Sequence, residues 1–186
     1  MPVLLVRVLL RTLMVVFTLT SLACSVLGGV TESDLERRHG LRFFRGQPFT
    51  GYAAEFDNAG QQRLRVHFRQ GLMDGQRTTW FANGQRATSE VYRHGQKVGI
   101  HTGWYPGGSR RFRYQFSDGQ FYGDQWEWYA SGQVYRVMHY VDGRERGQKI
   151  WRRSGQIYAN YVAVNQKKLG LLGGRLCDYP SGPPKP

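Results

Sequence analysis

The sequence has few of the residues from which catalytic centres and metal sites are usually built. It contains only two cysteines, Cys24 and Cys177. No Gly-x-Ser-x-Gly and no Gly-x-x-x-x-Gly-Lys-Ser/Thr motif occurs, so the sequence indicates neither a nucleophile elbow nor a phosphate-binding loop. Metal sites need clustered ligands at short spacing, whereas the histidines are scattered: His39, His67, His94, His101 and His139. The sequence therefore predicts no catalytic residue, no metal and no cofactor.

Acidic residues are also scarce, since 13 Asp and Glu stand against 26 Lys and Arg and give a net charge of +13. A basic surface suits an acidic partner such as nucleic acid, anionic lipid or an anionic glycan. A charged face that keeps an extended sheet soluble is an equally weighted alternative. The 24 glycines and the 14% of aromatic residues indicate β-structure with many turns rather than disorder.

The N-terminal segment has the pattern of an export signal. Arg7 and Arg11 form a positive region, and residues 12–22 form an apolar core of secretory length. Ser21-Leu22-Ala23-Cys24 then resembles a bacterial lipobox, in which the cysteine is lipidated, although its leucine stands one place late. We expect residues 1–24 to be a signal segment with lipidation at Cys24. Ordinary cleavage nearby, or retention of residues 12–30 as an anchor, are alternatives, and all three place the body outside the cytoplasm.

Residues 25–44 are interpreted as a tether and a first strand. Thr31 or Ser33 is expected to cap a short helical turn, and Leu41–Phe44 is expected to form the strand. Residues 45–174 hold the repeat array described next, and residues 175–186 are a C-terminal tail. Cys177 in this tail has no intrachain partner if Cys24 carries lipid. A small residue buried against the last strand is the simplest interpretation, and an intermolecular disulfide, a metal ligand or a redox group are alternatives.

A repeat of 24 residues organises the rest of the chain. A fixed period of this size is typical of a repeat architecture. The unit before Gly75 keeps the same spacing with Phe56 and Phe68, and the last unit is one residue short, so that Trp151 arrives early. This gives about five units with decayed ends. The repeated positions are Gly75, Gly99, Gly123 and Gly147, then Trp80, Trp104 and Trp128, then Gly84 with its equivalents, then Tyr92 with its equivalents.

Each unit reads as a β-hairpin, because Asn83-Gly84 between two runs predicts a type I′ turn. The second runs alternate, which places aromatic and aliphatic residues on one face. The opposite face is expected to carry a basic set made of Arg63, Arg65, Arg111 and Arg113, with His67 and His139 in register. A two-residue loop pairs Trp80 with Ala87 and separates the tryptophans from Tyr92. A three-residue loop swaps that assignment, and the sequence leaves the choice open.

The Gly-x-x-x-Gly spacing, the Trp80-Phe81 and Trp128-Tyr129 pairs and the Asn83-Gly84-Gln85 turn together resemble bacterial MORN-repeat-variant proteins. The resemblance covers roughly residues 46–174. It implies an all-β, single-layer, twisted antiparallel meander of hairpins, preceded here by an apolar helix or signal segment. Members of that family are linked to membranes, lipids and protein partners, and some are labelled antitoxins. The family offers no catalytic residues to carry over.

We therefore expect a non-enzymatic scaffold at the bacterial cell envelope that binds an unknown protein partner or an anionic membrane surface. The basic set is the expected binding surface, and nucleic acid is not an expected partner of an exported protein. An antitoxin-like protein that neutralises a partner in the cytoplasm is one alternative. A hydrolase or transferase with a groove along the sheet is another, for which the sequence offers no triad or ligand cluster.

Overall fold

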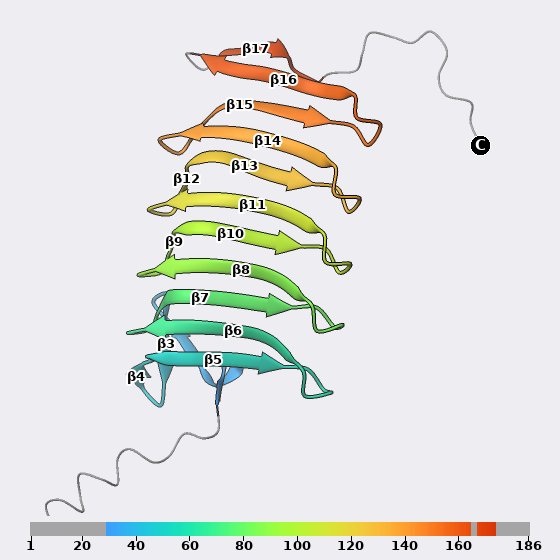
Figure 1. Cartoon of the computed structure of the whole chain (residues 1–186). Coiled ribbons are helices and arrows are strands. Elements are labelled where there is room, and N and C mark those ends of the chain that lie inside the picture. The colour runs from blue at the N-terminus through green and yellow to red at the C-terminus, as the bar shows by residue number, and fades with distance from the viewer. Residues whose placement is uncertain (1–28, 165–166, 174–186) are drawn as a thin grey trace, which may run out of the picture. The chain divides into compact units, whose positions relative to one another are not determined.

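The computed structural model describes residues 29–164 and 167–173, and this part of the chain is almost entirely β-structure. Antiparallel hairpins follow one another along the chain, which confirms the all-β hairpin meander (Figure 1). The described residues contain one short 3-10 turn, η1 (Glu32–Asp34), and no α-helix. None of the helical structure in these ranges is long and apolar enough to cross a membrane. The signal segment, Cys24 and Cys177 lie outside the described residues.

The main sheet has 14 strands, in the order β1-β5-β6-β7-β8-β10-β11-β13-β14-β15-β16-β17, with β9 beside β8 and β12 beside β11. From β5 onward each long strand pairs with the next one in the chain, as Figure 1 shows. The strands are β1 (Val30–Thr31), β5 (Gly51–Phe56), β6 (Gln62–Arg69), β7 (Leu72–Trp80), β8 (Arg86–Arg93), β9 (Gln96–Lys97), β10 (Gly99–Trp104), β11 (Arg110–Ser117), β12 (Gln120–Phe121), β13 (Gly123–Trp128), β14 (Val134–Val141), β15 (Arg144–Trp151), β16 (Ile157–Val164) and β17 (Lys167–Leu171).

A second, three-stranded sheet forms before the repeats, from β2 (Glu36–Arg38), β3 (Leu41–Phe44) and β4 (Gln47–Pro48). Its central strand coincides with the predicted first strand. The backbone amide of Thr31 donates to Asp34 Oδ2 at 2.9 Å, which caps η1. The amide of Arg42 donates to the carbonyl oxygen of Gly71 at 2.9 Å. The segment interpreted as a tether and a first strand is therefore folded, and its strand β3 lies against the connection between β6 and β7.

The hairpin turns differ from the prediction. A type I′ turn at Asn83-Gly84 needs positive φ at both residues, but only Gly84 has one, at 78°. The amide of Phe81 donates to Gln85 at 2.8 Å and that of Gly84 donates to Phe81 at 3.0 Å, which defines a three-residue loop that ends on a left-handed glycine. The type I′ turn predicted at Asn83-Gly84 is therefore wrong, and the three-residue loop, which the sequence leaves open, is the one that forms.

The two-residue turns lie at the other end of the strands. Asp118 and Gly119 have φ of 47° and 79° and connect the paired residues Ser117 and Gln120. A positive φ at both central residues is the geometry of a type I′ turn. The leading glycine of each repeat lies in these turns. The aspartate, histidine or glutamine before that glycine is the other residue with positive φ.

A β-bulge after each three-residue loop decides which face carries the tryptophans. Trp80 pairs with Arg86 and Thr79 pairs with Thr88, so that Ala87 has no partner across the strand pair. Each extra residue exchanges the two faces for the residues beyond it, because side chains alternate along a strand. A three-residue loop without a bulge would therefore place Trp80 on the same face as Tyr92. The bulge adds a second exchange, so that Trp80 lies on the opposite face. The same shift occurs at Trp104, Trp128 and Trp151.

The sheet consequently has two different faces. We call the face that carries Trp80, Trp104, Trp128 and Trp151 the tryptophan face, and the other the core face. The core face holds the buried apolar side chains Leu64, Val66, Phe68, Tyr92, Phe116, Met138 and Tyr161. It also holds two buried polar side chains, His101 and Gln125, with 1% and 0% of their surface exposed.

The repeat glycines have two structural roles. Gly75, Gly99 and Gly123 have φ of 108°, 66° and 67°, a region that favours glycine. Gly147 has no such φ and is instead a point of close approach. A Cβ at Gly147 would lie 2.6 Å from the carbonyl oxygen of Tyr161. The one-residue shortening of the last unit thus places this glycine in a different environment.

Candidate binding face

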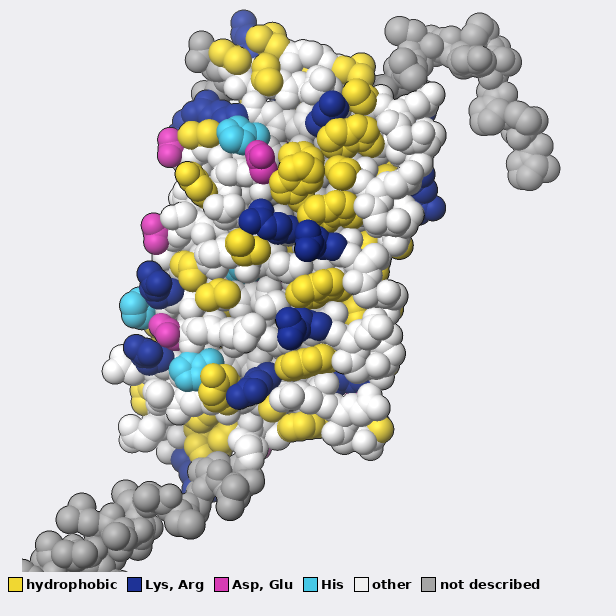
Figure 2. Space-filling model, viewed as in Figure 1, with side chains coloured by type: hydrophobic (Ala, Val, Ile, Leu, Met, Phe, Trp, Pro, Cys, Tyr) yellow, Lys and Arg dark blue, Asp and Glu magenta, His cyan; other side chains and the backbone are white. Residues whose placement is uncertain are grey.

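In the central repeats of the tryptophan face, aromatic rings and cations alternate from strand to strand. In the register, Trp80 pairs with Arg86 and Trp104 pairs with Arg110. The guanidinium carbon of Arg86 lies 5.7 Å from the ring centre of Trp104, in the next hairpin. That of Arg110 lies 5.4 Å from the ring centre of Trp128. Figure 2 shows the resulting column of hydrophobic side chains with Lys and Arg between them.

The aromatic column continues at both ends without a cation in register: Trp128 pairs with Val134, and Trp151 pairs with Ile157. Lys149 Nζ lies 5.1 Å from the ring centre of Trp151. At the other end Phe56 takes the tryptophan position and pairs with Gln62. Cation–ring contacts within about 6 Å are attractive because the ring face is electron-rich. The tryptophans themselves are half-buried.

The structure divides the predicted basic set between the two faces. Arg65 and Arg113 lie on the tryptophan face, where Arg113 pairs with Trp126. Arg63 and Arg111 are the unpaired residues of two β-bulges, where side chains do not alternate between the two faces. Arg111 lies 6.0 Å from the ring centre of Tyr105 and lines a hollow with the core-face residues Phe112 and Tyr114. Arg63 forms an ion pair with Asp57, the residue equivalent to Tyr105 in its own repeat.

Sequence reasoning missed three cations of the tryptophan face: Arg86, Arg110 and Lys149. A usable signal was present, because Arg86 and Arg110 are separated by one repeat of 24 residues. Their alignment with the tryptophans depends on the bulge, which the sequence pattern did not reveal.

Cations on the two faces also differ in whether a carboxylate lies beside them. On the core face, Arg77 pairs with Glu90 and Arg136 pairs with Glu127, each at 2.7 Å. On the tryptophan face, no described residue forms an ion pair with a set that we call the free cations: Arg65, Arg86, Arg110, Arg113 and Lys149. His139 and Arg69, which share this face, do have acidic partners: His139 contacts Asp124 at 2.7 Å, and Arg69 lies 3.7 Å from Asp74. Positive charge therefore accumulates on the tryptophan face.

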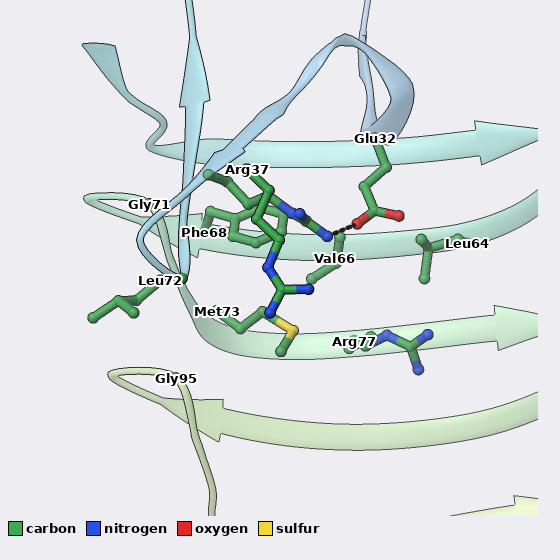
Figure 3. Close-up of a pocket in the computed structure, with 12 residues that line it drawn as sticks. Glu32, Arg37, Leu64, Val66, Phe68, Gly71, Leu72, Met73, Arg77 and Gly95 are labelled. Atoms are coloured by element: carbon green, nitrogen blue, oxygen red, sulfur yellow. Dashed lines mark hydrogen bonds and ion pairs between the residues drawn. The ribbon is translucent and has the colours of Figure 1, made fainter. Parts of the chain in front are cut away.

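A pocket of about 300 Å³ lies at the β6–β7 end of the core face, beside the small sheet (Figure 3). Its polar wall includes Glu32, Arg37 and Arg77. Arg42 donates to Glu32 at 2.7 Å, so this guanidinium is already neutralised. Protonated Glu55 can donate a hydrogen bond to the Glu32 carboxylate, and this bond, with some burial, raises the pKa of Glu55. These carboxylates belong to an ion-pair network, and Glu55 itself is exposed.

The second hollow, of about 330 Å³, is aromatic and lies on the core face between β10 and β14. Glu127 accepts hydrogen bonds from the hydroxyl of Tyr114 and from Arg136 there. Burial, together with this bond, raises the pKa of Tyr114. Within the described ranges, no group of three or more histidine, cysteine or acidic side chains is arranged to hold a metal ion.

No protein-family model and no curated protein sequence matches this chain. Among solved structures, it is similar in part to the GtfA/B complex bound to UDP and GlcNAc, with a TM-score of 0.27 and 15% sequence identity. The match covers 72% of this chain and 26% of that chain. A similarity this low supports no argument about fold or activity.

Proposed function

We propose that the protein is a non-enzymatic repeat scaffold of the cell envelope whose tryptophan face binds an anionic partner. The observation that carries the proposal is the segregation of charge. On the core face Arg77 and Arg136 are paired with carboxylates, whereas the free cations share the face of the tryptophans and have no such partner among the described residues.

The energetics favour association over catalysis. Each basic residue near an anionic surface contributes about 1 kcal/mol. Indole rings add apolar contact area and one hydrogen-bond donor each, a combination that suits interfaces. Several such groups in one row therefore supply binding energy spread along the sheet, without converging on one reacting atom.

The envelope location rests on the sequence. The export-like segment and the lipobox-like Ser21–Cys24 would tether the repeat body to a membrane, and the resemblance to MORN-repeat-variant proteins agrees with that placement. Metabolic labelling with a palmitate analogue, in the natural chain and in Cys24→Ala, tests lipidation. Label in the natural chain that is lost in the variant supports a lipoprotein. Recovery of unlabelled protein in the cytoplasmic fraction favours the antitoxin-like alternative.

The binding proposal is tested by co-sedimentation of the full chain with isolated envelope fragments. The test variant changes Arg65, Arg86, Arg110 and Arg113 to Gln. A control removes the same charge away from the tryptophan face, at Arg37, Arg45, Arg152 and Arg153, all of which are exposed. We expect the test variant to lose most of its binding and the control to keep it. Equal losses in both variants would show that net charge, and not this face, is responsible.

A further inference from the structure

We infer that the tryptophan face is a periodic binding site for a linear glycan in which a neutral sugar alternates with an acidic sugar. The inference rests on the proposed function and names the class of partner. Two properties of the face carry it: the distance between successive tryptophans, and the arginines that lie between Trp80, Trp104 and Trp128.

The spacing of the row suits a polysaccharide. Trp80, Trp104 and Trp128 stand on β7, β10 and β13, and one strand separates each from the next. Strands in a sheet lie about 4.8 Å apart, so equivalent side chains recur about every 9.6 Å. This is close to the length of one disaccharide in an extended β-linked glycan.

The order of groups within each interval suits the same polymer. Each tryptophan offers an apolar ring against which a sugar ring can stack, and the next group in the row is a guanidinium at Arg86 or Arg110. Guanidinium groups bind carboxylates and sulfates with two parallel hydrogen bonds. In the two central intervals, one ring platform and one cation thus match one neutral and one acidic sugar per disaccharide. The flanking intervals carry Gln62 and Val134 at the position of the cation.

The same features fit a membrane or a nucleic acid less well. A surface that inserts into a bilayer needs protruding apolar tips, but these tryptophans are half-buried beside longer arginine side chains. A nucleic-acid strand carries a charge about every 3.4 Å along the helix axis, which is denser than one cation in about 9.6 Å. A bilayer also imposes no register, whereas the aromatic positions of the row recur once in each hairpin.

The test uses hyaluronan oligosaccharides of increasing length, because they alternate N-acetylglucosamine with glucuronic acid. Binding to the full chain is followed by tryptophan fluorescence and by calorimetry. We expect affinity to rise with each disaccharide and to level off once the oligosaccharide spans Phe56 to Trp151, a distance of about 38 Å or four disaccharides. Chitin oligosaccharides of equal length, which lack the acid, should bind at least about tenfold more weakly.

Two variants tie the binding to the row. Arg86→Gln with Arg110→Gln should weaken binding of the longest oligosaccharide by about tenfold or more, since two charge contacts are lost. Trp104→Ala should lower the length at which affinity levels off, because it interrupts the row. The charge-matched control at Arg45 and Arg153 should leave both quantities unchanged. If Trp104→Ala does not fold, the arginine pair alone decides.

The outcomes separate this inference from the proposed function. Tighter binding to oligothymidylate than to hyaluronan of equal charge, or binding only to phosphatidylglycerol vesicles, overturns the glycan inference and leaves an anion-binding face. Affinity for hyaluronan that does not depend on length also overturns it. Absence of binding to every anionic probe overturns both.

Discussion

The imidazole Nε2 of His101 lies 2.9 Å from the carbonyl oxygen of Val91, and Gln125, one repeat later, bonds the backbone of Gln115 in the same way. Both side chains are almost completely buried. They stand where neighbouring hairpins separate, because β8 and β10 pair only at Thr88 and Ser89. Where the strands of neighbouring hairpins do not pair, buried backbone groups need other hydrogen-bond partners. The side chains of His101 and Gln125 provide these partners.

This relationship predicts a stability loss in mild acid. Burial lowers the pKa of His101 below its ordinary value of about 6.5. As the pH falls below about 6.5, His101 binds a proton in the unfolded chain but not yet in the folded chain. The folded state therefore loses stability until the pH reaches the lower pKa of His101 in the folded chain. Urea unfolding at neutral pH and at pH about 5 measures the effect.

The substitution His101→Gln provides the control, because Gln125 shows that glutamine fits this environment. We expect little change at neutral pH and a weaker dependence on pH between about 5 and 6.5. His101→Leu should instead cost about 1–3 kcal/mol at neutral pH, since the Val91 backbone loses its partner. An unchanged pH profile in His101→Gln would show that another group titrates.

Arginines of the two faces should differ in their effect on stability. Arg136→Gln leaves Glu127 without its ion-pair partner in a half-buried setting, and we expect a loss of about 1–2 kcal/mol in the free energy of unfolding. Arg113→Gln, on the tryptophan face, should change it by less than about 0.5 kcal/mol. Denaturant unfolding of both variants gives the comparison. Equal losses would contradict the division into paired and free cations.

The glycine at position 147 should not tolerate a side chain. Gly147→Ala puts a Cβ 2.6 Å from the backbone of Tyr161, and the strands must separate or shift. We expect a loss of about 1–3 kcal/mol, as for other overpacked sites. Gly107→Ala is the matched control, since nothing lies within 4 Å of its Cβ position. Thermal unfolding that shows no difference between the two variants would refute the close approach.

Much of the architecture could be predicted because it follows from local rules. Glycines every 24 residues mark chain reversals, and alternating runs between them mark strands. The strand at Leu41–Phe44 and the cap at Thr31 were read from the same kind of local signal. The small sheet around β3 was not predicted, because its position depends on contacts such as Arg42 with Gly71 that are distant along the chain.

The candidate site was predicted only in part. Arg65 and Arg113 were found from alternation within one strand. Arg63 and Arg111 were misplaced, because each occupies a bulge where alternation fails. Arg86 and Arg110 were overlooked, because only the bulged register sets them beside the tryptophans.

The sequence by itself determined the repeat, the hairpins and the excess of positive charge, since each depends on residue type and spacing along the chain. The tertiary structure alone decided which side chains share a face. A strand has a side-chain period of two, so a single unpaired residue reverses every later assignment. A three-residue loop and a bulge cancel one another in each repeat, and that cancellation brings the tryptophans and the free cations together.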